Sequence, residues 1–185
     1  MSDKKEIFPT QPSLVGKNIF LRPAKSDDIV NAHYWFLLSE PQYQCCHPVP
    51  FETPSQKAEA VRNNPLPGHQ KLTIVRKEDK TPVGQITFYD YNPLNQSAAM
   101  GLIVDPDQRR NGYAREAARL LIKYLFKHLN LNKVHAETAA FNLEAVALLE
   151  SVGFKKDGTL RQHYFYDGAF HDKLVYSIMR FELDW

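Results

Sequence analysis

A short basic segment ending in glycine is the part of this sequence best suited to bind an anion. It runs from Val104 to Ala114 and lies between an apolar stretch and an amphipathic pattern. Gly112 has no Cβ, so the backbone there can approach a ligand closely. A helix that starts beside it directs unpaired N–H groups and a partial positive charge outward, and Arg109 and Arg110 add charge. These features are typical of a pyrophosphate site, although a solvated basic helix start with a turn glycine would contain the same residues.

Other binding motifs are missing from the chain. It has no Gly-x-x-x-x-Gly-Lys-Ser/Thr loop and no Gly-x-Gly-x-x-Gly, so the sequence favours neither a P-loop nucleotidase nor a dinucleotide oxidoreductase. The only cysteines are the neighbours Cys45 and Cys46. A bridge between adjacent residues is strained and closes almost no loop. We therefore expect free thiols, and because neither cysteine has metal-ligand spacing, no metal site.

Composition narrows the class of protein. The 185 residues correspond to one ordinary domain, and a 43% hydrophobic share can build a sizeable core. A net charge of +2, from 23 basic and 21 acidic residues, gives no electrostatic footprint for nucleic acid. No apolar run suits a membrane span or a secretory leader. The sequence predicts a cytoplasmic protein without nucleic-acid or membrane partners, with a flexible arm at 1–14 and a single domain at 15–185.

Hydrophobic periodicity predicts the elements that must position the basic segment. Asn142 is suited to cap a helix, and Gly153 is suited to end it in the left-handed conformation. We expect an α/β or α+β domain, with one mixed sheet flanked by helices. The predicted strands are 19–22, 71–77, 83–91, 98–104, 134–139, 160–166 and 173–183, and the predicted helices are 29–38, 53–63, 114–125 and one starting after 142.

Three motifs in order resemble the GCN5-related N-acetyltransferases (GNAT). Residues 109–114 resemble the family's acetyl-CoA signature Arg/Gln-x-x-Gly-x-Gly/Ala. Residues 140–154, which contain Asn142 and end in Gly153-Phe154, resemble its second motif. The stretch from Asp157 to Ser177 resembles the tail of the RimJ/RimL-like branch. The resemblance is dense from 83 to 180 and thinner over 15–82.

This resemblance implies a fold and a cosubstrate site. The implied fold is a mixed, mostly antiparallel sheet whose central fourth and fifth strands splay apart to admit acetyl-CoA, with no metal. Matching positions assign the pantetheine amides and the thioester to backbone groups of Leu102, Ile103 and Val104. Asn142 would bind the pantetheine arm, although it is equally explained as a helix cap. The residues that match the pyrophosphate site are Arg109, Arg110, Asn111, Gly112, Tyr113 and Ala114.

The resemblance also implies direct transfer of an acetyl group from acetyl-CoA to a primary amine in a ternary complex. Three positions depart from common family patterns: Ala99, Ala145 and Leu149 stand where relatives often have a glutamate, a serine and a tyrosine. The general base and acid therefore cannot be carried over. Glu137 is our candidate base, because it is a charged residue on the predicted fifth strand. A solvent-exposed or ion-paired carboxylate is the alternative reading.

The acceptor side is less defined. Asp90, His163, Tyr164 and Tyr166 are candidates to line the acceptor pocket, with ordinary turn, core or surface roles as alternatives. A protein N-terminus, a polyamine and an amino sugar remain open as acceptors, and the sequence is compatible with a homodimer. Because three usual catalytic positions are apolar, a noncatalytic acyl-CoA-binding or sensor domain is the alternative function.

Overall fold

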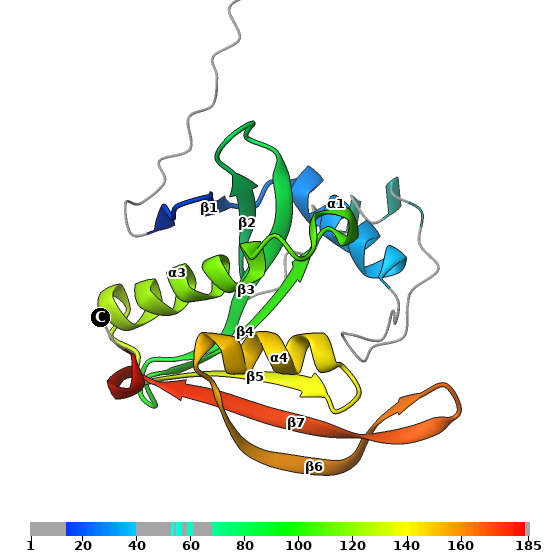
Figure 1. Cartoon of the computed structure of the whole chain (residues 1–185), viewed down its shortest axis with the longest axis vertical. Helices are drawn as coiled ribbons and strands as arrows, with labels where there is room; N and C mark the ends of the chain where they lie inside the picture. Colours follow the sequence, from blue (N-terminus) through cyan, green and yellow to red (C-terminus); the bar gives the residue numbers. More distant parts are fainter. Residues whose placement is uncertain (1–13, 40–52, 54, 57–58, 61–67, 184–185) are drawn as a thin grey trace, which may run out of the picture.

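A seven-stranded sheet forms the centre of the molecule, with the strand order β1-β2-β3-β4-β5-β7-β6 (Figure 1). The computed structural model describes residues 14–39, 53, 55–56, 59–60 and 68–183. The strands are β1 (Ile19–Pro23), β2 (Gln70–Arg76), β3 (Pro82–Asn92), β4 (Ser97–Val104), β5 (Lys133–Ala139), β6 (Lys155–Tyr166) and β7 (Ala169–Met179). The helices are α1 (Ser26–Leu38), α3 (Tyr113–His128) and α4 (Leu143–Val152), with short 3₁₀ turns η3 (Pro106–Gln108) and η4 (Arg180–Glu182).

The predicted fold class is confirmed, including the separation of two central strands. Every pairing in the sheet is antiparallel except that of β4 with β5. Those two strands run parallel and pair over only three positions, the last of which joins Ala99 to His135. Beyond that point β4 stays paired with β3 as far as Val104, and β5 stays paired with β7 as far as Ala139. The sheet is therefore open between the two strands.

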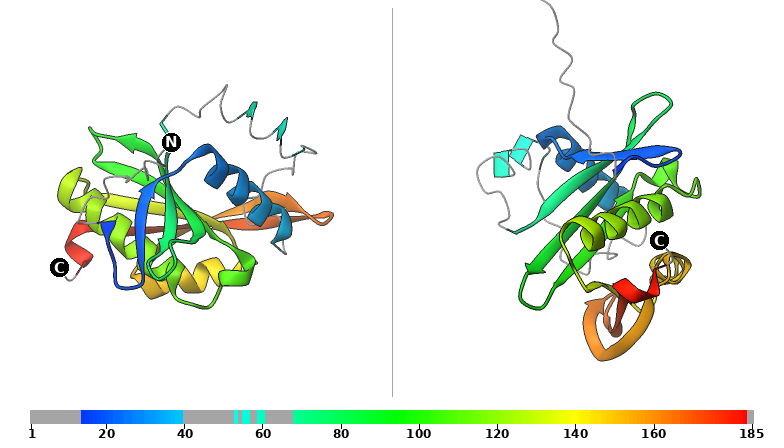
Figure 2. Two further views of the ribbon diagram at one scale, coloured as in Figure 1. Left: turned by 90° about the horizontal axis from the view of Figure 1, so that it is seen from above. Right: turned by 90° about the vertical axis from the view of Figure 1, so that its left-hand side faces the viewer.

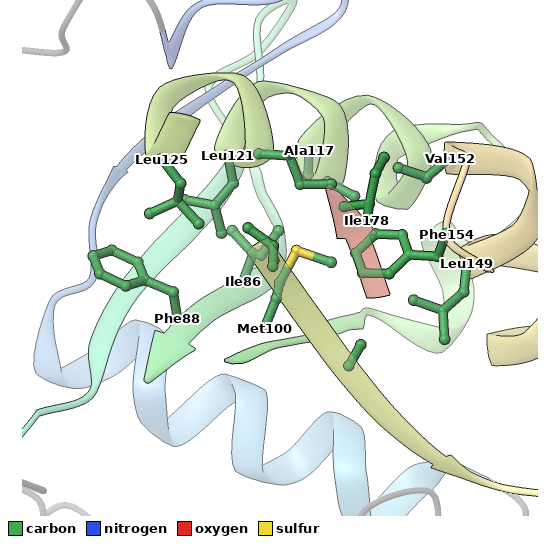
Figure 3. Packing of buried hydrophobic residues seen from close by; sticks show 14 of the residues in the cluster. Ile86, Phe88, Met100, Ala117, Leu121, Leu125, Leu149, Val152, Phe154 and Ile178 are labelled. Atoms are coloured by element: carbon green, nitrogen blue, oxygen red, sulfur yellow. The ribbon is translucent and has the colours of Figure 1, made fainter. Parts of the chain in front are cut away.

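Helices cover both faces of the sheet. On one face, α3 packs Ala117, Leu121 and Leu125 into the main core beside Ile86 and Met100, and α4 contributes to the same core (Figure 3). On the other face α1 packs against the sheet, with Ala32 and Trp35 in contact with Ile103 of β4. The β6–β7 hairpin extends past the rest of the sheet (Figures 1 and 2).

Helix boundaries follow the capping residues that the sequence indicates. The Asn142 side chain accepts a hydrogen bond from the Ala145 N–H at 3.1 Å, and Gly153 ends α4 with a φ of 110°. Thr53 and Gln56 form the expected reciprocal capping bonds, at 2.8 Å from the Thr53 N–H and 3.3 Å from the Gln56 N–H. Within the helix expected at 53–63, residues 55, 56, 59 and 60 are helical, and Thr53 lies just before the helix. The remaining residues of this range lie outside the described residues.

The predicted bounds of the last two strands are wrong at three ends, one of which is the start of β7 at Ala169 rather than at residue 173. The last strand was expected to reach Leu183, but β7 ends at Met179 because the Glu182 carboxylate accepts a hydrogen bond from the Met179 N–H at 2.9 Å and closes a 3₁₀ turn. The neighbouring strand β6 starts at Lys155 rather than at residue 160, because its first residues pair with Ser177 and Tyr176.

The main core includes one residue that the sequence assigned to the N-terminal arm. Leu14, the last residue of the predicted arm, is buried in the main core, whereas residues 1–13 lie outside the described residues, as do Cys45 and Cys46. Within the described part of the chain, no helix has both the length and the apolar character needed to cross a membrane.

Candidate active site

A cleft of about 910 Å³ occupies the gap between β4 and β5. Leu102, Ile103 and Val104 line it from β4, and Glu137 and Thr138 line it from β5. Because β4 has no partner on this side beyond Ala99, backbone groups that a continuous sheet would use remain available there for a ligand. The cleft can thus hold an extended ligand along the open edge of a strand.

The loop before α3 closes one end of this cleft and has the backbone geometry of an anion site. Arg110 and Gly112 both adopt positive φ values, of 63° and 78°. Gly112 is the N-cap of α3, and no side chain caps this terminus. The first N–H groups of this sixteen-residue helix have no partner within the helix, and the residues at its start, Gly112, Tyr113 and Ala114, line the cleft. A Cβ at Gly112 would meet no atom within 4 Å, so conformation rather than crowding favours glycine.

The side chains of this loop have distinct contacts. Arg109 lines the cleft, and its guanidinium donates to Ser39 Oγ at 2.6 Å and lies 3.6 Å from the Glu144 carboxylate. It therefore joins the end of α1 to the first turn of α4. Asn111 does not line the cleft, since its amide donates back to the carbonyls of residues 108 and 109 at 3.2 and 3.3 Å. Arg110, Gly112, Tyr113, Ala114 and Asn142 do line it.

Glu137 lines the cleft and is also ion-paired. Its carboxylate contacts the ammonium of Lys173, which lies on β7. The Lys173 side chain is 12% exposed and that of Glu137 is 37% exposed. The same ammonium lies 5.7 Å from the ring centroid of Tyr164, which is the one predicted acceptor-pocket residue that lines the cleft.

The other three predicted acceptor-pocket residues do not line the cleft, and local backbone irregularities explain two of the placements. Asp90 has a φ of 50° at an irregularity between β3 and β4 and is exposed. His163 lies within a register shift of β6 and packs edge-on against Tyr164, with ring centroids 5.0 Å apart. Tyr166 packs near Phe141, with ring centroids 5.7 Å apart.

Several cleft residues were not found by sequence reasoning. Tyr89 lines the cleft and stacks on His69, with ring centroids 5.0 Å apart and planes 5° apart. Burial, together with the negative charges of Glu137 and Asp90, raises the pKa of the Tyr89 phenol, which therefore stays protonated. The alternation of Gln85, Thr87 and Tyr89 along β3 was the available signal, since alternate strand residues share a face.

Two buried polar atoms of the cleft have no hydrogen-bond partner. They are Nε2 of Gln85 and Oγ1 of Thr138, and both residues line the cleft. An unsatisfied buried donor is unfavourable unless a ligand supplies its partner. In the described part of the chain, no group of three or more His, Cys, Asp or Glu side chains is arranged to hold a metal ion.

Comparison with known proteins identifies similar sequences. The family model "Acetyltransferase (GNAT) domain" matches residues 18–155. The chain is 33% identical over 107 residues to Bacillus subtilis (strain 168) "Uncharacterized N-acetyltransferase YoaA", covering 58% of this chain and 60% of the length of that relative. It is 27% identical over 123 residues to the "Spermidine N(1)-acetyltransferase" of Vibrio cholerae, covering 66% of this chain and 71% of that protein.

Solved structures share the fold. The crystal structure of spermidine N-acetyltransferase from Vibrio cholerae in complex with CoA and spermine superposes with a TM-score of 0.80. The match covers 90% of this chain and 98% of that chain at 21% sequence identity. The shared fold therefore spans nine tenths of this chain.

Proposed function

Because the chain belongs to the GNAT acetyltransferase family, we propose that it transfers the acetyl group of acetyl-CoA to a primary amine. Family membership confirms the resemblance to the GNAT acetyltransferases, and the relatives named N-acetyltransferases agree with it. The observation that carries the proposal is the divergence of β4 from β5 after Ala99. It opens a cleft next to the N-terminus of α3, as acetyl-CoA binding requires.

The cleft residues fit the parts of this cosubstrate. The N–H groups before and at the start of α3, with the positive charge of Arg110, suit the pyrophosphate. The open edge of β4 at Leu102–Val104 suits the pantetheine amides and the thioester, and a backbone N–H of this edge would polarise the thioester carbonyl. Asn142 uses Oδ1 for its helix cap, which leaves its Nδ2 to donate to the pantetheine arm.

The reaction needs a neutral amine. A lysine-like amine has a pKa of ~10.4, and its deprotonation at pH 7 costs about 4–5 kcal/mol. Glu137 is our candidate for the proton acceptor, acting directly or through a water. Its place on the cleft wall and its exposure support this role. Tyr89 and His69 line the same cleft and would contact the acceptor.

For the acceptor we propose a small primary amine, with spermidine as the first compound to test. The 27% identity to a spermidine N(1)-acetyltransferase supports this choice. A protein N-terminus is the second class, because residues 157–177 resemble the RimJ/RimL-like tail. An amino sugar is the third.

One experiment separates these acceptors. Release of free CoA thiol is measured with acetyl-CoA and a panel of spermidine, an N-terminal peptide and an amino sugar, beside calorimetric binding of acetyl-CoA. We expect binding together with turnover on the small amine. Turnover on the peptide alone would reassign the acceptor, and absence of acetyl-CoA binding would overturn the proposed function.

A noncatalytic acyl-CoA sensor is the second candidate. The observation that favours it is the apolar character of Ala145 and Leu149, both of which line the cleft. It predicts micromolar acetyl-CoA binding with no thiol release on any amine of the panel.

A further inference from the structure

We propose that the hydroxyl of Thr138 donates a hydrogen bond to the sulfur of the cosubstrate and stabilises the thiolate as it leaves. This inference rests on the proposed function. It assigns a catalytic contact to a residue that none of the sequence motifs indicated. It also supplies a polar group on the side of the cleft where Ala145 and Leu149 offer none.

The first step is the direction in which Thr138 points. Successive strand residues face opposite sides of a sheet, and Val134 and Ala136 of β5 lie in the main core together with α4 residues. Thr138 therefore faces the α4 side. Leu174, the residue of β7 that pairs with Thr138, lies in the same core, which agrees with this direction.

The second step is that the Thr138 hydroxyl lacks a partner. The residue is only 4% exposed, and its Oγ1 is buried without a hydrogen bond. Threonine on a buried strand face beside valine and alanine loses the hydration of its hydroxyl and regains nothing from the protein. A ligand in the cleft is then the natural partner, because Thr138 lines that cleft.

The third step is the position of Thr138 along the cleft. The last β4–β5 pair joins Ala99 to His135, so continuing the parallel register by three residues would set Leu102 opposite Thr138. The two strands separate instead, and Leu102 and Thr138 lie on opposite walls of the gap. Leu102 begins the stretch that we assign to the thioester. The sulfur of a thioester held there would lie between these walls.

The fourth step concerns the other groups on this side. The α4 residues after Glu144 that line the cleft are all apolar: Ala145, Leu148, Leu149 and Val152. Glu144 is a carboxylate that accepts rather than donates, and it lies beside Arg109 at the mouth. Asn142 already caps α4 through Oδ1. Among these described residues, Thr138 provides the hydroxyl donor on the strand wall.

The chemistry of transfer matches this placement. The amine lone pair forms a C–N bond with the acetyl carbon, the C–S bond breaks, and its electron pair stays on sulfur as the CoA thiolate. The proton lost by the amine passes to Glu137, directly or through water. Thr138 keeps its proton and only hydrogen-bonds the thiolate, which later takes a proton from solvent. Because residues 137 and 138 face opposite sides of β5, one strand serves both the entering and the leaving group.

The test compares Thr138→Val, which removes the hydroxyl at nearly constant shape, with Thr138→Ser, which retains it. The complex of each protein with CoA is titrated with base, and the ultraviolet absorbance of the thiolate gives the pKa of the bound thiol. A hydrogen bond to a charged acceptor predicts that the valine variant raises this pKa by about one unit, while the serine variant stays near the wild type. With an amine that the wild type acetylates, kcat should fall about tenfold in Thr138→Val and stay near the wild-type value in Thr138→Ser.

Each result supports or overturns the proposal. Equal thiol pKa values in the wild type and the valine variant, with CoA bound to both, would refute the role of Thr138 while leaving the proposed function intact. Failure of the wild type to bind CoA would refute both. If Thr138→Val does not fold, as judged by thermal unfolding, Thr138→Ala takes its place in the comparison with Thr138→Ser. If Thr138→Ser raises the pKa of the bound thiol as much as Thr138→Val does, the result would also count against a hydroxyl donor.

Discussion

The carboxylate of Glu137 and the ammonium of Lys173 form an ion pair between β5 and β7, at the edge of the cleft. They are diagonal neighbours, since Glu137 is opposite Val175 and Lys173 is opposite Ala139. Lys173 is the more buried partner, so it fixes one side of the carboxylate while the other side remains open to the cleft. A carboxylate that is held in this way is oriented before any acceptor binds.

Glu137→Gln is expected to lower kcat/KM by at least about tenfold, because the amide can still accept a hydrogen bond from Lys173 but cannot take a proton. Acetyl-CoA affinity should be unchanged. Steady-state rates over a range of pH, beside calorimetry, measure both effects. A variant with the pH–rate profile of the wild type would remove Glu137 from the mechanism.

Glu144→Gln is the matched control for that variant. It also removes a glutamate that lines the cleft, but one that lies in the first turn of α4 beside Arg109. We expect its amine-dependent pH profile to match that of the wild type. A loss equal to that of Glu137→Gln would mean that the cleft needs negative charge in general rather than a base at residue 137.

The sequence indicated correctly the local backbone features around the cleft, namely the glycine conformations and the ends of α4. The loop at 109–112 and the caps at Asn142 and Gly153 depend on glycine conformation and on side-chain-to-backbone bonds within a few residues. The gap between β4 and β5 was anticipated through the family resemblance. Periodicity alone could not have indicated it, because a strand beside a gap has the same pattern as a paired one.

Contacts between distant elements were beyond sequence reasoning. The partner of Glu137 lies on β7, and the stack of His69 on Tyr89 joins the start of β2 to β3. Thr138 is an ordinary strand residue in sequence, and only its burial without a partner singles it out. Asp90 was a candidate because it ends a predicted strand, and the irregularity of β3 at this position, which leaves Asp90 outside the cleft lining, has no signal in the sequence.

Gly112→Glu is expected to abolish acetyl-CoA binding and to leave the fold intact. A Cβ at residue 112 would meet no atom within 4 Å, so the side chain has room, but it adds an anion where we assign the pyrophosphate. Calorimetry and thermal unfolding measure the two effects. Unchanged affinity would contradict the cosubstrate assignment.

Gly112→Asn separates charge from backbone strain. Asparagine tolerates the left-handed conformation better than most residues, which matters because φ at this position is 78°. This variant should retain binding, weakened by about tenfold or less. If Gly112→Asn and Gly112→Glu both lose acetyl-CoA binding completely, the site requires the backbone conformation of glycine, and the added negative charge is not the cause of the loss.

Asn142→Ser distinguishes a helix cap from a ligand contact. Serine caps helices about as well as asparagine, so thermal stability should be retained, whereas the amide nitrogen proposed to bind the pantetheine arm is lost. We expect acetyl-CoA affinity to fall about tenfold. Asn142→Ala should lose this affinity and also about 1 kcal/mol of stability. Wild-type affinity in the serine variant would leave Asn142 a structural cap alone.

Asp28→Asn is expected to destabilise the fold by about 3 kcal/mol at pH 7, because it breaks a buried ion pair that joins α1 to β1. Arg22 donates to the two Asp28 oxygens at 2.6 and 3.0 Å, and the Lys25 N–H donates at 2.8 Å. Burial opposes ionisation of this carboxyl, but the hydrogen bonds from Arg22, Lys25 and Thr73 outweigh it and hold its pKa below the ordinary value. The ionised pair therefore contributes stability above the unfolded-state pKa of ~3.9, and this contribution is lost as pH falls through the folded-state pKa. Urea unfolding of both proteins at several pH values should show their difference shrinking in acid, and a constant difference would contradict a stabilising charge at Asp28.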